Sequence, residues 1–253
     1  MYKYKSGLFN FKIDHLAEEI PAVLVYNGIS HVVMMVTPYN LDLFAIGFSL
    51  SEGIVNNYND ILGIDIKHNE HGIEIQVDIS SRCFEKLKIK KRGITGRTGC
   101  GICGIEQLNQ ISQSNIKPVP FTQKIDLKKI DYAIKQLNMY QPIGKTTHCT
   151  HVAAFINIHG ELLYGYEDIG RHVALDKLLG HISQTNRNGA ILISSRASYE
   201  IVQKSAMCFI EVIFAISAAT TLAVKIAEKY NVTLVGFAKP GCYTIYTHPQ
   251  RLI

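Results

Sequence analysis

The C-terminal part of the chain alternates short apolar runs with amphipathic helical patterns. The apolar runs read AILISS, VIFAIS and VTLVGFA, and the helical segments SYEIVQKSAMCF and AATTLAVKIAEKY lie between them. Strands that are apolar throughout and are joined through helices form parallel sheets that carry helices on both faces. A hairpin pattern (HVAAFINIHGELLYGYE) and a helical pattern (RHVALDKLLGHIS) precede these runs. The alternation therefore predicts an α/β fold with a mostly parallel sheet.

A polar loop follows each of these three strands, and the loops read SSRAS, SAATT and KPGC. Because the carboxyl ends of parallel strands share one edge of a sheet, ligands of open α/β folds bind there. Ser194, Arg196 and Ser217 offer hydroxyl and guanidinium donors at this edge. Ser198 and Thr220 can equally serve as helix N-caps, which is the simpler interpretation.

The chain, at 253 residues, is long enough for one large domain with a smaller one attached. For residues 1–85 the sequence pattern predicts a small N-terminal α+β domain, with a hairpin turn at residues 27–28, a helical run and a second hairpin. Residues 86–121 predict a basic, Cys-containing loop and connector. Residues 122–253, which open with a helix capped by Asp126, predict the α/β domain that would bind a ligand.

The overall charge is mildly basic, with a formal net charge of +5 and a pI near 8.8. This indicates an anionic partner but is too weak to indicate nucleic acid. The N-terminus has neither the apolar core nor the cleavage site of a secretion signal. The most apolar stretch, MCFIEVIFAISAATTLAV, contains Glu211 and fits a helix end, a strand and a helix start better than a membrane span. Six cysteines without a secretion signal fit a reducing cytosol, so we expect a cytoplasmic protein without a membrane partner.

Cys100 and Cys103 form a C-x-x-C pair among glycines, and Arg97 lies three residues before the first cysteine. A thiolate is the reactive form of cysteine, and its pKa falls near cations and at helix N-termini. The glycines leave the backbone open to a bulky reactant. The pair is typical of a nucleophile on an accessible loop, and a purely structural loop is the less favoured alternative.

Zinc binding and disulfide exchange also use such pairs. A structural zinc site needs four ligands and a catalytic one needs three plus water. The chain has no second C-x-x-C, although His148, Cys149 and His151 can complete a site. Zinc deaminases carry H-x-E and P-C-x-x-C, which are absent here. A thioredoxin-type motif would open the helix of a βαβ unit, whereas a basic, glycine-rich stretch precedes this pair.

A second group of chemically active residues lies in the segment GYEDIGRHVALDK. Its ionisable side chains are Glu167, Asp168, Arg171, His172, Asp176 and Lys177. At the start of a helix, Arg171 would suit a phosphate. The alternative is that Asp176 simply pairs with His172 four residues before it.

Four segments together resemble the FdhD/NarQ family, the formate dehydrogenase accessory sulfurtransferases. They read FAIGFSLSEGIV, TGCGICG, EDIGRHVALDK and THPQRL, they occur in the family's order, and the resemblance runs from about Pro21 to Leu252. The family's fold is similar to that of cytidine deaminases, with a small N-terminal domain. The resemblance therefore implies a layered α/β domain with a mostly parallel sheet, plus a smaller α+β domain.

The resemblance also implies a cytoplasmic, homodimeric sulfurtransferase that is required for formate dehydrogenase activity. Such a protein takes sulfur from a cysteine desulfurase as a cysteine persulfide. It then passes the sulfur to the molybdenum cofactor, bis-molybdopterin guanine dinucleotide, before the cofactor enters formate dehydrogenase. By the same motif, Cys100 would bear the persulfide and Cys103 would be the second cysteine.

The family's cofactor-binding segment falls on the loop after the last predicted strand. Its residues here are Phe237, Ala238, Lys239, Pro240, Gly241 and Cys242. No metal ion of its own and no nucleic-acid partner are expected. A zinc-dependent hydrolase or deaminase on the same fold, and a non-catalytic nucleotide-binding module, are the alternatives from other functional classes.

Overall fold

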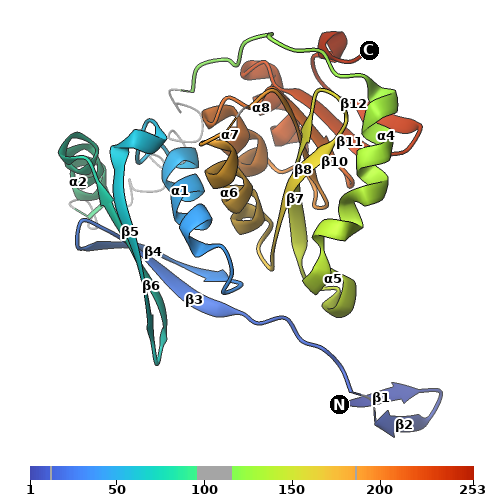
Figure 1. Ribbon diagram of the computed structural model, residues 1–253, viewed down its shortest axis with the longest axis horizontal. Helices are drawn as coiled ribbons and strands as arrows, with labels where there is room; N and C mark the ends of the chain where they lie inside the picture. Colours follow the sequence, from blue (N-terminus) through green and yellow to red (C-terminus); the bar gives the residue numbers. More distant parts are fainter. Residues whose placement is uncertain (12, 96–115, 186) are drawn as a thin grey trace.

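The computed structural model describes residues 1–11, 13–95, 116–185 and 187–253. A small sheet and a large sheet enclose a helical layer, and further helices cover the far face of the large sheet (Figure 1). The mixed α/β character and the additional N-terminal sheet are as predicted. The Cys pair, Cys100 and Cys103, lies outside the described residues.

The small sheet is built from the two predicted hairpins, in the order β4-β3-β6-β5. Its two central strands, β3 and β6, run parallel to each other, and each outer strand pairs antiparallel with its hairpin neighbour. The first hairpin turns at Asn27 and Gly28, whose φ angles of 44° and 81° are left-handed, as a two-residue hairpin turn requires. The strands are β3 (Ile20–Tyr26), β4 (Ile29–Val36), β5 (Ile61–Asn69) and β6 (Gly72–Ile79).

The large sheet has the strand order β12-β11-β10-β9-β7-β8. Strands β9, β10 and β11 are parallel, but β7 is antiparallel to both β8 and β9, and β12 is antiparallel to β11. The prediction of a mostly parallel sheet therefore holds only for the centre, because a hairpin forms each flank. The strands are β7 (His151–Asn157), β8 (Leu162–Asp168), β9 (Gly189–Ile193), β10 (Val212–Ala215), β11 (Thr233–Lys239) and β12 (Cys242–Ile245).

The helices follow the predicted periodicity, and two predicted caps are present. Asp126 accepts a hydrogen bond from the Lys128 N–H, and Thr220 accepts one from the Ala223 N–H. Within the described residues, no helix has the length and apolar character needed to cross a bilayer. The helices are α1 (Leu41–Ser51), α2 (Ser81–Thr95), α4 (Leu127–Gln136), α5 (Pro142–Thr147), α6 (Arg171–Ile182), α7 (Tyr199–Met207) and α8 (Thr221–Lys229), with short 3-10 turns at Tyr58–Asp60, Leu137–Tyr140 and Pro249–Arg251.

Helix α2 corrects the prediction that the basic stretch from residue 86 is a loop. The helix continues to Thr95, with Cys83 and Leu87 buried one turn apart on its inner face. Lysine and glutamate are good helix formers, so a basic segment with apolar residues at this spacing is compatible with a helix. The many charged residues made this apolar spacing hard to recognise in the sequence.

Helices α1 and α6 cross in close contact at two glycines. A Cβ on Gly47 would lie 1.7 Å from the carbonyl oxygen of Asp176, and a Cβ on Gly180 would lie 2.0 Å from that of Leu43. Only glycine allows the two backbones to approach this closely. The crossing joins the helix of the small sheet to the helix that covers the large one.

The apolar core forms two clusters, one on each face of the large sheet. The first fills the space between the two sheets around α1, α6 and α7, and the second lies between the large sheet and α4. One cluster thus contains residues of both sheets. The predicted boundaries at residues 85 and 121 stay a prediction.

A two-stranded hairpin at the N-terminus was not expected from the sequence. Strands β1 (Tyr2–Lys5) and β2 (Leu8–Phe11) pair with each other and lie apart from both larger sheets (Figure 1). The residues from 13 to 19 lead from this hairpin to the start of β3.

Candidate functional site

The polar loops after β9, β10 and β11 meet at one edge of the large sheet, as predicted. Backbone hydrogen bonds join them: the Ala197 N–H donates to the Ala218 carbonyl, and the Phe237 N–H donates to the Ser217 carbonyl, both at 3.0 Å. Because β7 runs antiparallel to β9, the start of β7 and the end of β8 reach the same edge. We call this edge the carboxyl rim. It comprises residues 149–151, 169–172, 194–198, 216–220 and 237–242.

The predicted cofactor-binding segment, Phe237 to Cys242, forms the hairpin between β11 and β12 at one end of the rim. Strand β11 continues to Lys239, and the sequence did not predict β12. Phe237 has a left-handed φ of 50°, which is uncommon for a bulky side chain, and its ring is 46% exposed. The hairpin therefore holds an accessible aromatic ring in a constrained backbone.

Asp131 on α4 anchors the turn of this hairpin. Its Oδ1 accepts hydrogen bonds from the Gly241 N–H, at 2.9 Å, and from the Tyr243 hydroxyl. The hydrogen bond from Tyr243 is the main cause that lowers the pKa of Asp131, while burial and the same carboxylate raise the pKa of Tyr243. The structure brings all six predicted residues together, and their role in binding a cofactor stays a prediction.

Cationic side chains gather at the other end of the rim. Arg171 is the first residue of α6, Arg196 is exposed in the loop after β9, and His151 begins β7. Burial, and then the positive charges of Arg171 and Arg196, lower the pKa of His151. Both guanidinium groups are thus within electrostatic reach of one imidazole ring. The Arg171 Nε is buried and has no hydrogen-bond partner among the described residues.

The N-termini of α6 and α7 point to this cationic end and lack side-chain caps. Helix α6 follows Gly170, which has no side chain, and α7 follows Ser198, whose hydroxyl makes no cap hydrogen bond. The Ser198 Oγ is buried and has no partner among the described residues. Helix N-termini carry unsatisfied N–H groups and partial positive charge, which favour anions. Two such termini with two arginines form a site suited to phosphate.

His172 pairs with Glu200 rather than with Asp176. The His172 Nε2 lies 2.7 Å from a Glu200 carboxylate oxygen. Burial lowers the pKa of His172, and the Glu200 charge only partly offsets this effect. The predicted pairing of His172 with Asp176 is wrong, because the two side chains meet different neighbours around α6.

Asp176 belongs to a buried cluster that joins α1, α6 and α7. It accepts a hydrogen bond from the Ser51 hydroxyl at 2.7 Å and pairs with the Lys204 ammonium at 3.0 Å. Lys204 also pairs with Glu52 at 2.7 Å. Burial alone would lower the pKa of Lys204, but the two carboxylates raise it overall. These charges hold helices together and do not face the rim.

Lys177 and Asp168 form a second buried pair. Both side chains are fully buried, and their charged atoms lie 2.7 Å apart. The N–H and hydroxyl of Thr37, which follows β4, each donate to Asp168 at 2.9 Å. Burial lowers the pKa of Lys177, against the opposing effect of Asp168. The pair therefore fastens the small sheet to the large one.

Glu167 is likewise used in packing. Its carboxylate accepts hydrogen bonds from the N–H groups of Ile143 and Gly144, at 2.9 and 2.8 Å, and from the Thr150 hydroxyl at 2.8 Å. It thus caps the start of α5. Of the charged segment, only Arg171 and His172 remain at the rim.

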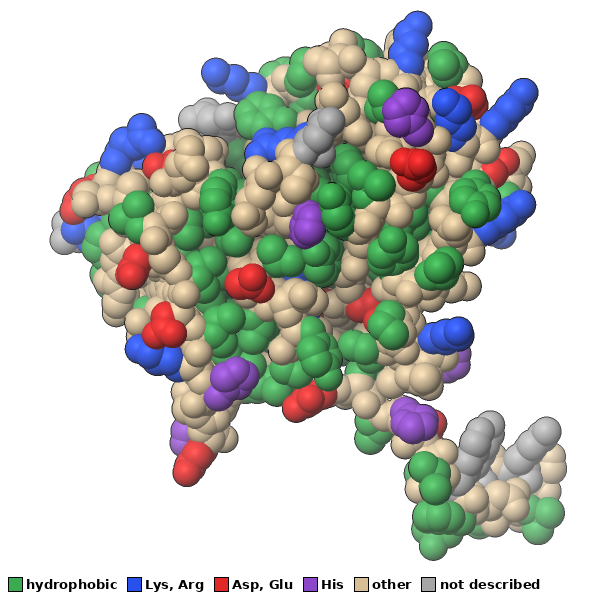
Figure 2. Space-filling view, in the orientation of Figure 1, with side chains coloured by type: hydrophobic (Ala, Val, Ile, Leu, Met, Phe, Trp, Pro, Cys, Tyr) green, Lys and Arg blue, Asp and Glu red, His purple; other side chains and the backbone are tan. Residues whose placement is uncertain are grey.

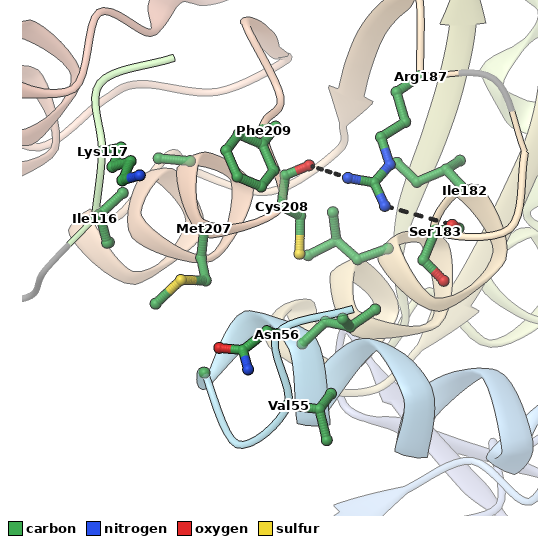
Figure 3. Close-up of a pocket in the computed structure, with 14 residues that line it drawn as sticks. Val55, Asn56, Ile116, Lys117, Ile182, Ser183, Arg187, Met207, Cys208 and Phe209 are labelled. Carbon is green, nitrogen blue, oxygen red and sulfur yellow. Dashed lines mark hydrogen bonds between the residues drawn. The ribbon is translucent and has the colours of Figure 1, made fainter. Parts of the chain in front are cut away.

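A cavity of about 340 Å³ lies at the opposite edge of the sheet, where α1, α6 and α7 end (Figure 3). Met207, Cys208 and Phe209 line it, and Arg187 donates to the carbonyls of Cys208 and Ser183 at 3.4 Å. Lys117, two residues after the stretch outside the described residues, lies on the other side. The sequence did not indicate this cavity, because its walls come from helix ends far apart in the chain.

The described cysteines divide into two buried and two exposed thiols. Cys83 and Cys208 are buried, and burial raises the pKa of Cys208 to about 12. Cys149 and Cys242 are exposed at the rim. Among the residues that the structure describes, no group of three His, Cys, Asp or Glu side chains is placed to hold a metal ion. His148, Cys149 and His151 therefore form no metal centre by themselves.

The fold and rim define an α/β protein whose ligands are expected at the carboxyl ends of its central strands. The chain belongs to the FdhD/NarQ family, whose model matches residues 17–253. This confirms the family resemblance seen in the sequence. The solved structure of a proposed formate dehydrogenase accessory protein from Desulfotalea psychrophila is 23% identical, with a TM-score of 0.80 over 100% of this chain and 97% of that chain. At this identity the likeness shows a shared fold, and the deaminase-like layering stays a prediction.

Proposed function

We propose that this protein serves formate dehydrogenase maturation as a sulfur carrier for the molybdenum cofactor. Cys100 attacks the persulfide of a cysteine desulfurase, takes over its outer sulfur and releases the desulfurase thiolate. The sulfur then passes to bis-molybdopterin guanine dinucleotide before formate dehydrogenase receives the cofactor. Membership of the FdhD/NarQ family supports this role, and the fold is shared with a proposed formate dehydrogenase accessory protein.

The observation that carries the proposal is the cluster of cationic groups at one end of the carboxyl rim. The acceptor is a dinucleotide with several phosphates, and Arg171, Arg196 and two uncapped helix N-termini gather at one end of the rim. Phe237 presents an exposed aromatic ring at the other end, where a guanine can stack.

The rim is long enough to hold an extended ligand. Four strand-to-strand steps separate β11 from β8, and at about 4.8 Å per step they span about 19 Å. The backbone hydrogen bonds between the loops hold the rim together before the ligand arrives. A long anionic ligand would therefore contact both the Phe237 hairpin and the arginines.

The thiol chemistry favours a cysteine outside the core as the carrier. Sulfur transfer requires an accessible thiolate, and the raised pKa of buried Cys208 leaves it protonated at neutral pH. Cys149 and Cys242 are exposed but lack the C-x-x-C setting of Cys100. They are matched controls for the role of Cys100.

Mass spectrometry tests the carrier directly. After incubation of the full chain with a cysteine desulfurase and cysteine, we expect one added, reducible sulfur atom on Cys100. Cys149→Ser and Cys242→Ser should keep this modification, and Cys100→Ser should lose it. Persulfide found only on other cysteines, or none, contradicts the assignment. Cys103→Ser tells whether the second cysteine assists loading or delivery.

Two measurements separate this role from the alternatives. Stoichiometric zinc that is lost in Cys100→Ser would support a zinc-dependent hydrolase or deaminase. Intact formate dehydrogenase activity in cells that carry only Cys100→Ala would support a non-catalytic nucleotide-binding module. A cytoplasmic location is part of the proposal and is checked by cell fractionation.

A further inference from the structure

The N-terminal hairpin has two faces of different character. In its register Tyr2 lies opposite Phe11, and Tyr4 lies opposite Phe9. Residues paired across a strand ladder share a face, so these four rings lie together. The rings of Tyr2 and Phe11 meet at 5.6 Å, and those of Tyr4 and Phe9 at 5.1 Å. We call these four residues the aromatic face; Leu8 lies on the opposite face.

The aromatic face is exposed. The four side chains are between 62% and 73% exposed, and Figure 2 shows apolar side chains gathered on the detached hairpin. A two-stranded hairpin alone is marginally stable in water, and a contiguous exposed apolar patch usually marks an interaction surface.

The outer face of the small sheet carries a matching apolar strip. Val23 pairs with Val33, and Pro21 pairs with Met35, across β3 and β4. The alternate residues of these strands belong to the core cluster between the two sheets (Ala22 and Leu24) or pack against it (Val32 and Met34), so these two pairs face outward. Val33 is 61% exposed and Met35 is 44% exposed. We call these four residues the outer strip.

The area of the aromatic face favours a second copy of this chain, with two arms exchanged, over a different partner that would contact one arm only. An aromatic side chain has about 150–250 Å² to bury, and the four rings of one arm are about two-thirds exposed, so one arm hides about 500 Å², or about 1,000 Å² with the surface beneath it. This is below the size of a stable interface, whereas two exchanged arms reach about 2,000 Å². The stretch between Phe11 and Ile20 spans up to about 30 Å when extended, which is enough to reach a neighbouring chain.

We infer that the aromatic face of the N-terminal hairpin packs on the outer strip of a second copy, and that the two copies exchange arms. The exchange is symmetric, because each copy supplies one arm and one strip, and it closes as a dimer. It assigns a surface to the homodimer that the family resemblance implies, and it is independent of the sulfur chemistry.

Sedimentation equilibrium on the full chain tests the exchange. We expect a dimer whose dissociation constant rises by roughly 100-fold or more in the double variant Phe9→Ser, Phe11→Ser, since both rings are central anchors. Val33→Asp, in the strip, should have a similar effect. Leu8→Ser is the matched control, because Leu8 is equally exposed on the other face of the hairpin, and it should leave the dimer intact.

A crosslink distinguishes exchange from an arm that folds back on its own chain. A benzoylphenylalanine placed at Phe9 should crosslink to the peptide that contains Val33, and mixed ¹⁵N-labelled and unlabelled chains should yield products that combine both labels. Far-UV circular dichroism confirms that each variant is folded.

Three outcomes would overturn the inference. They are a monomeric full chain, a dimer that survives the double variant, and crosslinks only within one chain. Binding of the wild-type monomer to phosphatidylcholine–phosphatidylglycerol vesicles, lost in the double variant, would assign the aromatic face to a lipid surface instead. None of these results affects persulfide loading on Cys100, so the two proposals fail separately.

Discussion

The charges buried between α1, α6 and α7 and the charges at the carboxyl rim come partly from one short segment of chain. Asp168, Asp176 and Lys177 all have charged partners within 3.0 Å in the interior. Arg171 lies on the same helix as Asp176 and Lys177, yet its Nε is buried without a partner among the described residues. Helix α6 thus turns its paired charges toward the core and its N-terminus toward the rim.

The contrast shows which polar groups remain for a ligand. Buried polar groups are normally satisfied within the protein, so those that are not need an explanation. Arg171 Nε and Ser198 Oγ are two such atoms, and both lie at the rim. The interior charges determine stability, and the rim groups are expected to determine binding.

The largest expected effect is on stability, from breaking an interior pair. Lys177→Met leaves the Asp168 carboxylate buried without its counter-ion, and this should lower the free energy of unfolding by about 3–5 kcal/mol. Urea denaturation measures the change. Arg171→Met, in the same helix but at the rim, should change it by less than about 1 kcal/mol. Equal losses of unfolding free energy in the two variants would contradict the conclusion that the interior charges stabilise the fold and the rim charges do not.

A smaller loss is expected from filling the contact between the helices. Gly180→Ala places a Cβ against the Leu43 carbonyl and should cost about 2–3 kcal/mol, because two backbones must separate. Gly241→Ala, in the rim hairpin, meets open space and bears only the cost of its left-handed φ, about 1 kcal/mol. Thermal unfolding compares the two variants, and a reversed order would contradict the close helix crossing.

The rim arginines should affect binding without affecting stability. Arg171→Ala and Arg196→Ala are each expected to weaken GDP binding about 10-fold, as charged hydrogen bonds to phosphate are lost. Isothermal titration calorimetry measures this. Arg187→Ala, in the cavity at the opposite edge, is the control and should bind GDP normally. Lys239→Ala should weaken binding if the hairpin also contacts the nucleotide.

The serine and threonine that begin α7 and α8 should respond differently to loss of their hydroxyls. Thr220→Ala removes a cap hydrogen bond to Ala223 and should cost about 1 kcal/mol of stability. Ser198→Ala removes a buried hydroxyl without a described partner, so the stability of the ligand-free protein should change by only about a few tenths of a kcal/mol. GDP binding should weaken in Ser198→Ala alone. A stability loss as large as that of Thr220→Ala would show that Ser198 acts as an ordinary cap.

The smallest effect is a dependence of stability on pH. The pKa values of His151, His172 and His181 are all lowered in the folded protein, mainly by burial. Below about pH 6.5 the unfolded chain therefore binds more protons, and the free energy of unfolding should fall as the pH falls from 7.5 to 5.5. Urea midpoints across this range check the sign. His181→Gln should flatten the dependence, and stability that rises on acidification would contradict it.

Local pattern was enough to predict much of the fold. The alternation of apolar strands and helices after residue 188 correctly located β9, α7, β10, α8 and β11. Asp126 and the turn at Asn27-Gly28 were also recognisable, because caps and tight turns depend on neighbouring residues only. The antiparallel pairing of β7 with β9 and the strand β12 were not predicted, because periodicity does not encode which strands pair.

The sequence by itself determined the family, the order of the strands and helices along the chain, and the cysteine motif. Only the tertiary structure decided which charges are partners. Asp176 meets Lys204, 28 residues away, instead of the nearby His172, and Lys177 closes a contact with Thr37 across the two sheets. Such pairings depend on how helices cross, and at Gly47 and Gly180 the crossing is set by backbones too close for any side chain. The spacing of residues along the sequence does not reveal this close approach of the two helices.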